Sequence, residues 1–424
     1  MGPSSIRISF AAEKYPPARA QAAGPQGKRI ERTASPMDRI YLDNAATTAP
    51  RREAVDAMLP FLNESYANPS SPHRSGQRVK SALERARKQT AAAINAQAPE
   101  IIFTGGGSEA DSLAIFGIMD AYSGRGKHFI TSAIEHHAVL HAAHTLKARG
   151  AEITVVPVDG EGFVRPADVR AALRDDTVLV SIMHANNEIG TIQPIAALAA
   201  LAHERGALFH SDAVQTVGHI PVDVKSLGVD ALSLSAHKFE GPKGVGALFV
   251  KSGIRIAPIV VGGGQEGGRR AGTENVPGIV ALATALDLAI HELGESQPAA
   301  TRLRDALIDG VLSSVPAASL NGSREHRMPN NASLRFAKIE AETLVIGLDV
   351  EGIEASTGSA CTSGSLEPSH VLTAIGLDAN VARGTIRFSL GRMNSSDDIA
   401  RLLAVLPGII ERLRRLSGTL VAGA

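Results

Sequence analysis

The sequence is poor in cysteine, since Cys361 is the only one in 424 residues. A single cysteine excludes an intramolecular disulfide and any metal or cluster site that needs several cysteines of this chain. It fits the cytosol, where disulfides are rare, and we expect a cytoplasmic protein. Cys361 lies in "STGSACTSGSLEPSH" (356–370), without the apolar surroundings in which a free cysteine is usually buried. This placement needs an explanation.

The sequence also lacks an excess of charge and a long apolar run. Lys+Arg and Asp+Glu both number 43, so net charge favours neither nucleic acid nor a membrane surface as a partner. No uncharged apolar stretch reaches the roughly 18 residues of a membrane-spanning helix. The richest run, 279–290, is interrupted by Asp287. We therefore expect no transmembrane helix, and no repeat of fixed period is visible.

Residues 1–36 are rich in Pro, Ala and Gly and lack the apolar segment of a secretory signal. A transit segment stays open, but a disordered tail is the simpler interpretation, because Met37 directly precedes "DRIYLDNAATT". The expected organisation is a disordered extension (1–37), an N-terminal segment that packs with the small domain (38–50), a large domain (51–295) and a small C-terminal domain (296–424).

Short apolar runs alternate with helical patterns between about 50 and 290, as two predicted helices at 76–95 and 194–205 illustrate. The predicted strands are 101–104, 128–133, 152–158, 177–184, 207–212, 231–236 and 245–250. Such a pattern is typical of an α/β fold with a mainly parallel seven-stranded sheet flanked by helices. After 295 a smaller α+β domain is expected. Its predicted helices are 299–313, 341–348 and 396–416, and its predicted strands are 331–336 and 384–389.

Polar residues gather where the predicted strands end, which is where open parallel sheets bind ligands. "IIFTGGGSEADSLAIFG" (101–117) runs from a strand through three glycines into a helix. Glycines let the backbone approach an anion, and a helix N-terminus offers unpaired N–H groups. An ordinary glycine turn is the alternative for this segment taken alone.

Two neighbouring strand ends carry an acid and a lysine. Asp212 ends one strand, where a helix cap is its usual role, and Lys238 follows the next strand. A charged lysine is costly at a buried strand end, and lowering its pKa makes the amine a nucleophile towards carbonyls. A phosphate loop, an acid and a Schiff-base lysine together predict a pyridoxal phosphate site, in which the acid pairs with the pyridinium nitrogen.

Over about 38–417 the chain resembles the NifS/IscS-type cysteine desulfurases, in the class V group of fold-type I pyridoxal phosphate enzymes. The matching segments, in order, are "YLDNAATT", "NPSSPHRSG", "FTGGGSEADS", "EHHAVL", "HANNEIGTIQPI", "HSDAVQTVG", "SAHKFEGPKGVG", "GGGQEGGRRAGTENV", "STGSACTSGSLEPSHVL" and "TIRFSLGR". The resemblance implies that Lys238 binds pyridoxal 5′-phosphate, that Asp212 pairs with its pyridine nitrogen, and that His136 stacks on its ring and transfers protons.

The resemblance also implies the remaining binding residues. Asn187 and Gln215 would contact the pyridoxal hydroxyl and the neighbouring substrate region. Arg387 would hold the substrate carboxylate, a role that suits a bidentate guanidinium. The residues implied to hold the phosphate are Gly107, Ser108, Ser235, His237 and, from the partner subunit of a homodimer, Thr273. Ser108 stands where the family usually has threonine, and the hydroxyl is retained.

Cys361 matches the catalytic cysteine of this family, in a loop at about 356–368. The implied reaction converts L-cysteine to L-alanine and leaves the sulfur as a persulfide on Cys361. An acceptor protein would then take the sulfur for iron–sulfur cluster, thio-cofactor or tRNA synthesis, and Cys361 could ligate a cluster during the transfer. A selenocysteine lyase or another class V aminotransferase or lyase is the alternative. The sequence identifies neither the acceptor nor the group that deprotonates Cys361.

A metal site was weighed against this interpretation. His136, His137, His141 and His144 bring several imidazoles to helical spacing, which could suggest zinc. No cysteine is near, and His136 already has a role implied by the resemblance, so no metal site is expected. "GGGQEGGRR" (262–270) lacks the Lys-Ser/Thr of a nucleotide-binding P-loop. We expect this segment at the dimer interface.

Overall fold

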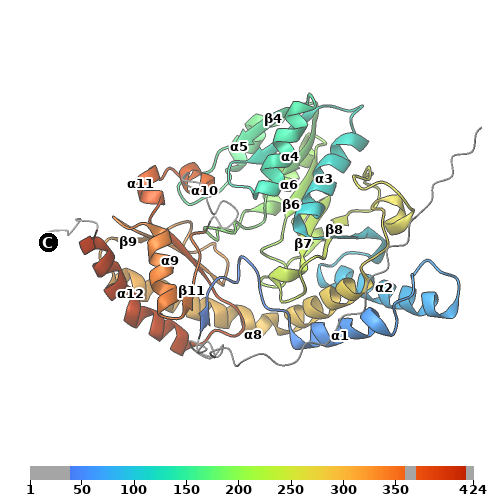
Figure 1. The fold of residues 1–424 in the computed structure, drawn as a ribbon. Helices are drawn as coiled ribbons and strands as arrows, with labels where there is room; N and C mark the ends of the chain where they lie inside the picture. The colour runs from blue at the N-terminus through green and yellow to red at the C-terminus, as the bar shows by residue number, and fades with distance from the viewer. Residues whose placement is uncertain (1–38, 359–368, 417–424) are drawn as a thin grey trace, which may run out of the picture. The chain divides into compact units, whose positions relative to one another are not determined.

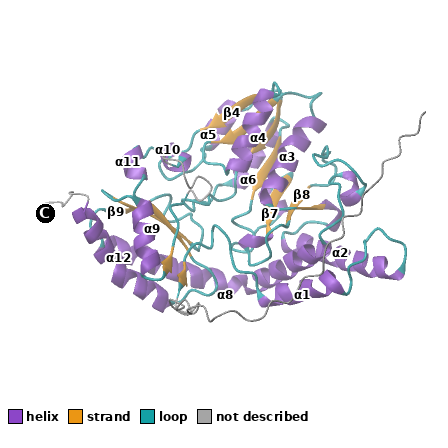
Figure 2. Ribbon diagram, in the orientation of Figure 1, coloured by secondary structure: helices purple, strands orange, loops and turns teal. Residues whose placement is uncertain are grey.

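The computed structural model describes residues 39–358 and 369–416 of the chain (Figures 1 and 2). Its largest sheet has seven strands. In spatial order they are β2 (Ile101–Thr104), β8 (Gly246–Val250), β7 (Ala231–Ser235), β6 (Leu208–Asp212), β5 (Thr177–Ser181), β3 (His128–Ser132) and β4 (Glu152–Val156). Each strand falls within a predicted one.

Six strands of this sheet point in the same direction. β8 pairs antiparallel with both β2 and β7, and the other neighbours pair in parallel. Two successive reversals give β2 the direction of β7, so six carboxyl ends lie along one edge. The predicted mainly parallel sheet is confirmed, and this shared edge is where a ligand site is expected.

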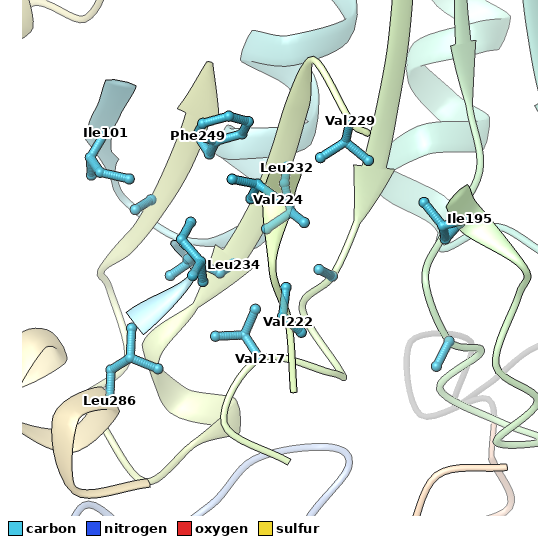
Figure 3. Packing of buried hydrophobic residues seen from close by; sticks show 14 of the residues in the cluster. Ile101, Ile195, Val217, Val222, Val224, Val229, Leu232, Leu234, Phe249 and Leu286 are labelled. Atoms are coloured by element: carbon cyan, nitrogen blue, oxygen red, sulfur yellow. The ribbon is translucent and has the colours of Figure 1, made fainter. Parts of the chain in front are cut away.

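Helices cover both faces of the large sheet, which explains its continuous apolar strands. Ile101 and Phe103 pack with one buried cluster and Ile102 with the other, as alternate residues of a strand must. The first cluster includes side chains from α2 (Arg74–Ala93), α6 (Ile195–Glu204) and α8 (Val276–Ser314), and the second from α3 (Gly107–Ala121) and α4 (His137–Ala148). Figure 3 shows part of the first cluster, including Leu232 and Leu234 of β7.

A second, smaller sheet lies later in the chain. Its antiparallel order is β12 (Thr385–Ser389), β10 (Asn331–Phe336), β9 (Ala318–Leu320), and β1 (Ile40–Tyr41) pairs in parallel with β11 (Ile353–Glu354). The remaining helices are α1 (Arg52–Asn63), α5 (Pro166–Ala172), α7 (Val224–Leu227), α9 (Ala341–Val350), α10 (His370–Ala374), α11 (Ala379–Ala382) and α12 (Ser396–Leu416). Short 3₁₀ turns are η2 (Ala98–Glu100), η3 (Ala236–Lys238) and η4 (Gln265–Gly268).

Helix α8 differs from the expectation of a separate helix at 299–313. It is continuous through Pro298, although proline removes a backbone donor within a helix. Its first half packs on the large-sheet cluster through Leu282 and Leu286, and its second half on the small-sheet cluster through Leu307 and Val311. Packing at both ends therefore outweighs the cost of one proline. α8 is long and apolar enough to cross a membrane, but half of its most apolar stretch is buried inside the protein, as in a core helix.

Arg327 joins loops of the two sheets. Its guanidinium donates to the carbonyl oxygens of Ile189 (2.9 Å), Ser323 (2.8 Å) and Asn331 (3.1 Å), and the residue is 3% exposed. Burial, together with the neighbouring cations Arg304 and Arg324, lowers the pKa of Arg327 to about 9. The side chain is therefore still charged at neutral pH, and the three carbonyls supply its compensation.

Replacing Arg327 with methionine should destabilise the protein. Arg327→Met keeps the aliphatic bulk but leaves three buried carbonyl oxygens without this donor, at a cost of roughly 3 kcal/mol in the free energy of unfolding. Urea denaturation at pH 7 measures the change. The matched control Arg52→Met alters an exposed side chain and should stay within about 0.5 kcal/mol. Equal effects of the two changes would contradict this role.

Candidate active site

A cavity of about 320 Å³ opens at the carboxyl ends of the large sheet's strands. It brings together most of the residues that the sequence singled out. Those lining it are Gly107, Ser108, His136, Asn187, Asp212, Gln215, Ser235, His237, Lys238 and Arg387. They come from the last residues of β6 and β7, from the segments that follow β2, β3, β5, β6 and β7, and from β12. The shared edge of the sheet therefore positions the site.

Lys238 reaches this cavity from η3, the turn that follows β7. Its Nζ donates to the carbonyl oxygens of Ala45 (2.5 Å) and Ala46 (2.9 Å), in the segment after β1. The Nε2 of Gln215 also donates to the carbonyl of Ala45, at 3.1 Å. His219 Nε2 lies 2.8 Å from the carbonyl oxygen of Lys238 and holds the turn itself. The amine is therefore directed by two adjacent backbone carbonyls, and the turn that carries it is held by His219.

Asp212 and His136 are a carboxylate and an imidazole on the same cavity. Asp212 Oδ1 accepts from the backbone N–H of Val214 at 2.9 Å. Burial raises the pKa of Asp212, while His136, that N–H and Lys238 oppose the rise. His136 Nδ1 accepts from the N–H of Ala138 at 3.1 Å, so the neutral ring carries its proton on Nε2. Burial lowers the pKa of His136 and favours that neutral form.

The N-terminus of α3 forms the other side of the cavity. Gly106, its N-cap, has φ 153° and ψ −177°, a conformation open mainly to glycine. A Cβ on Gly107 would lie 2.7 Å from Val214 Cγ2, so only glycine fits there. Burial, followed by Lys238 and Lys243, lowers the pKa of His237 to about 4 and keeps its ring neutral. Unpaired helix N–H groups beside Ser108 favour an anion at this end.

Arg387 is the largest fully buried side chain among the described residues. It comes from β12, and its Nη2 forms an ion pair with Asp43 Oδ1 at 2.6 Å. Its Nη1 donates to the carbonyl oxygens of Asn187 (3.0 Å) and Gly358 (3.3 Å). The Nε atom is buried and has no hydrogen-bond partner in the described part of the chain. A guanidinium so placed can bind a carboxylate that enters the cavity.

Four carboxylates of this site were not predicted from the sequence. Asp111, Glu135 and Glu188 also line the cavity, and Asp43 holds Arg387. Burial raises the pKa of each of Asp111, Glu135 and Glu188, and that of Glu135 to about 8. Each of the four lies in a segment that carried the family resemblance. Asp111, Glu135 and Glu188 lie close in sequence to the predicted residues Ser108, His136 and Asn187, and Asp43 lies in "YLDNAATT". This closeness in sequence was the available signal.

The histidines near His136 contact other imidazole rings and backbone groups. The ring of His137 lies 5.2 Å from that of His141 and 4.9 Å from that of His370, centroid to centroid. No group of three potential ligands suited to a metal ion occurs in residues 39–358 and 369–416. His136 instead caps α4, and His370 Nε2 lies 2.9 Å from the carbonyl oxygen of Glu135.

Two selected residues are not placed in this cavity. Thr273 is exposed, lies between η4 and α8, and is not among the residues that line the cavity. Because a single chain is described, its contribution to a partner's site stays a prediction. Cys361 lies in 359–368, outside the described residues. The described residue before that segment, Gly358, does line the cavity.

Comparisons with known proteins agree with this geometry. The family model "Aminotransferase class-V" matches residues 40–402. The curated "Cysteine desulfurase IscS" of Dictyoglomus turgidum is 54% identical over 378 residues, which are 89% of this chain and 96% of the relative. That of Methanosarcina thermophila is 53% identical over 89% of this chain and 93% of the relative. A solved "NIFS-LIKE PROTEIN" is 37% identical with a TM-score of 0.83, over 88% of this chain and 100% of that structure.

The fold and the site define a fold-type I enzyme, and the chain belongs to the aminotransferase class-V family. Within that family it falls among the cysteine desulfurases of the NifS/IscS type, as the sequence motifs predicted. Enzymes of this family use pyridoxal 5′-phosphate.

The residues present fit that cofactor. Asp212 and Lys238 meet on one cavity, and the α3 N-terminus lies beside Ser235 and His237. Asp111 Oδ1 is fully buried on the cavity wall and has no hydrogen-bond partner among the described residues. A buried polar atom of this kind is expected where a ligand completes the site.

Stability should depend on pH through Glu135. This buried carboxyl accepts from Ser132 Oγ (2.5 Å) and the N–H of Met183 (3.0 Å). Burial raises the pKa of Glu135 from 4.5 to about 8. The folded chain therefore holds a proton that the unfolded chain releases above pH 4.5. The stabilisation is complete below pH 4.5 and is lost as the pH rises to about 8.

Glu135→Gln removes the titrating carboxyl and keeps the shape of the side chain. As the pH rises from 5 to 8, the free energy of unfolding of the wild type should fall relative to that of the variant, by at most roughly 1.4 kcal/mol per pH unit. Urea denaturation across this range measures the difference. Glu325→Gln, at an exposed position, is the control and should run parallel to the wild type. A constant difference for Glu135→Gln would contradict the assignment.

Proposed function

We propose that this cysteine desulfurase uses pyridoxal 5′-phosphate on Lys238 and leaves the sulfur of L-cysteine as a persulfide on Cys361. The C–S bond of the substrate breaks and an S–S bond to the Cys361 sulfur forms. One proton ends on Cβ of the product, L-alanine, so atoms and electrons balance without an added reductant. The observation that carries the proposal is one cavity lined by the Lys238 amine, the Asp212 carboxylate and the Arg387 guanidinium.

Each cofactor contact proposed within one subunit rests on a cavity-lining residue. When bound, the cofactor withdraws electrons from the substrate Cα. Lys238 holds it covalently, Asp212 pairs with its pyridine nitrogen, and His136 stacks on its ring. Asn187 and Gln215 contact the pyridoxal hydroxyl and the neighbouring substrate region. The phosphate is held by Gly107, Ser108, Ser235 and His237, and by Thr273 of the partner subunit.

The protein groups also orient the substrate and move protons. Arg387 holds the substrate carboxylate, and Asp43 keeps that guanidinium in place through their 2.6 Å ion pair. His136 is the proton-transfer group, and Nε2 is the atom that acts, because Nδ1 is occupied by the N–H of Ala138. Burial lowers the pKa of His136 and favours the neutral ring, in which Nε2–H is available as the donor.

The partners follow from this chemistry. The enzyme is a homodimer in which "RRAGTENV" (269–276) of one subunit reaches the other subunit's phosphate. A thiol acceptor protein takes the sulfur in the cytosol, for iron–sulfur cluster, thio-cofactor or tRNA synthesis, and Cys361 can ligate a cluster during transfer. A solved relative described as "SspA in complex with cysteine", 34% identical with a TM-score of 0.74 over 83% of this chain and 98% of that structure, favours cysteine over selenocysteine as substrate.

The proposed domain division is 51–295 for the cofactor-binding domain and 296–424 for the small domain with the Cys361 segment. Separate hydrophobic clusters around the large and small sheets support it. Residues 38–50 are proposed to pack with the small domain, and the membership of Ile40 and Leu42 in its cluster supports this assignment. Residues 1–37 are proposed as a terminal extension, and 1–38 lie outside the described residues.

Lys238 should carry the cofactor. The purified protein should absorb visible light as a yellow solution, and borohydride reduction should leave the cofactor attached to the peptide that contains Lys238. Lys238→Ala should abolish both the attachment and turnover, because no other amine replaces the nucleophile. Peptide mass spectrometry identifies the labelled residue. Attachment to Lys243, the next lysine along the chain, would overturn the assignment.

Cys361 should accept the sulfur. Cys361→Ala should retain the cofactor absorbance and its change on adding L-cysteine, because Lys238, Asp212 and Arg387 are unaltered. Alanine formation should fall to near background. The wild type should gain one removable sulfur, and its single cysteine makes the mass assignment unambiguous. Both L-cysteine and L-selenocysteine are tested. A variant that desulfurates cysteine at the wild-type rate would favour the selenocysteine lyase alternative.

A further inference from the structure

Glu188 binds the chain that follows residues 359–368 and lies beside the chain that precedes them. It lies on the loop between β5 and α6, lines the cavity and is 5% exposed. Its Oε2 accepts from Ser369 Oγ at 2.6 Å. A Cβ added to Gly358 would lie 3.5 Å from the same Oε2 atom. One carboxylate therefore binds the first described residue after this segment and lies beside the last described residue before it.

The backbone around Glu188 is held firmly. Its N–H donates to Asn186 Oδ1 at 2.9 Å, and its carbonyl oxygen accepts from Asn331 Nδ2 at 3.3 Å. The carbonyl oxygen of the preceding residue, Asn187, accepts from Arg387 Nη1, and the same Nη1 donates to the carbonyl oxygen of Gly358. The loop that supports the guanidinium thus also carries the carboxylate that binds Ser369.

Ser369 uses its hydroxyl in two directions. As the N-cap of α10 it accepts from the N–H groups of Val371 (3.1 Å) and Leu372 (3.5 Å). As a donor it binds Glu188. Capping requires only the acceptor, so the bond to Glu188 is a separate interaction and can be changed separately.

We propose that Glu188 is a positioning residue for sulfur transfer, which through Ser369 fixes the described chain that follows residues 359–368 to the loop that lines the substrate cavity. The inference rests on the proposed function of Cys361. Glu188 acts on where the described residues that flank 359–368 are held relative to Arg387. The rate of persulfide formation depends on this placement, whereas capture of L-cysteine does not.

The test uses substitutions that preserve the cap. Ser369→Asp keeps a good capping oxygen but sets a carboxylate against Glu188, so it should slow persulfide formation on Cys361 by about tenfold or more, since small misplacements of reacting groups have large effects. Ser369→Asn also caps and can donate to Glu188, and should stay near the wild-type rate. Ser369→Asp combined with Glu188→Gln lets the new amide donate to the aspartate and should recover most of the loss.

Two measurements are made on each holoenzyme. Stopped-flow absorbance gives the L-cysteine concentration that half-saturates the first spectral change, which should vary by less than about twofold if substrate capture is unaffected. Quenched single-turnover mass spectrometry gives the rate of persulfide formation. Equal rates in Ser369→Asp and Ser369→Asn would overturn the proposal. So would a slow Ser369→Asp variant that Glu188→Gln does not relieve, or a loss confined to the half-saturating concentration. A wild type that forms no persulfide from L-cysteine would instead refute the function of Cys361.

Discussion

Burial of the Arg387 guanidinium is the constraint on which the arrangement of this site depends. A cation taken out of water is stable only when compensation is close and well oriented. Here Asp43 supplies it from the segment after β1, Asn187 from the loop after β5, and Gly358 from the chain after β11. Segments more than 300 positions apart (43 and 358) must therefore meet at one side chain. The same requirement forms the wall of the cavity that a substrate carboxylate would enter.

The large sheet could be predicted from the sequence because helices cover both of its faces. A strand buried on both sides is a continuous apolar run, and such runs marked the strands other than the edge strand β4, where Glu152 and Val155 are exposed. Their ends were less certain: the run 177–184 predicted a longer strand than Thr177–Ser181, because Ile182 and Met183 are buried after the ladder ends. The continuity of α8 through Pro298 could not be predicted, because it results from packing on two separate clusters that no local pattern reports.

The site residues that sequence analysis found share a position at the end of a strand, where topology alone brings them together. Asp212 and Lys238 are examples. The residues it missed are buried carboxyls whose function depends on what surrounds them. Asp111 lies within a helix and Glu135 in a turn, and neither position is unusual for an acid. Only tertiary structure reveals that desolvation raises the pKa of both.

These raised pKa values have a consequence for the charge of the cavity. If Asp111, Glu135, Glu188 and Asp212 were all ionised, four carboxylates would face one lysine and an arginine that is already paired with Asp43. Burial raises the pKa of all four, but the basic side chains of His136 and Lys238 oppose the rise at Asp212, and that of Arg387 opposes it at Glu188. Unequal environments of this kind separate the pKa values of like groups and allow one acid to serve as an anion. Asp111 and Glu135 thus add little negative charge to the cavity, and Asp212 is the carboxylate suited to the proposed pairing with a cofactor ring nitrogen.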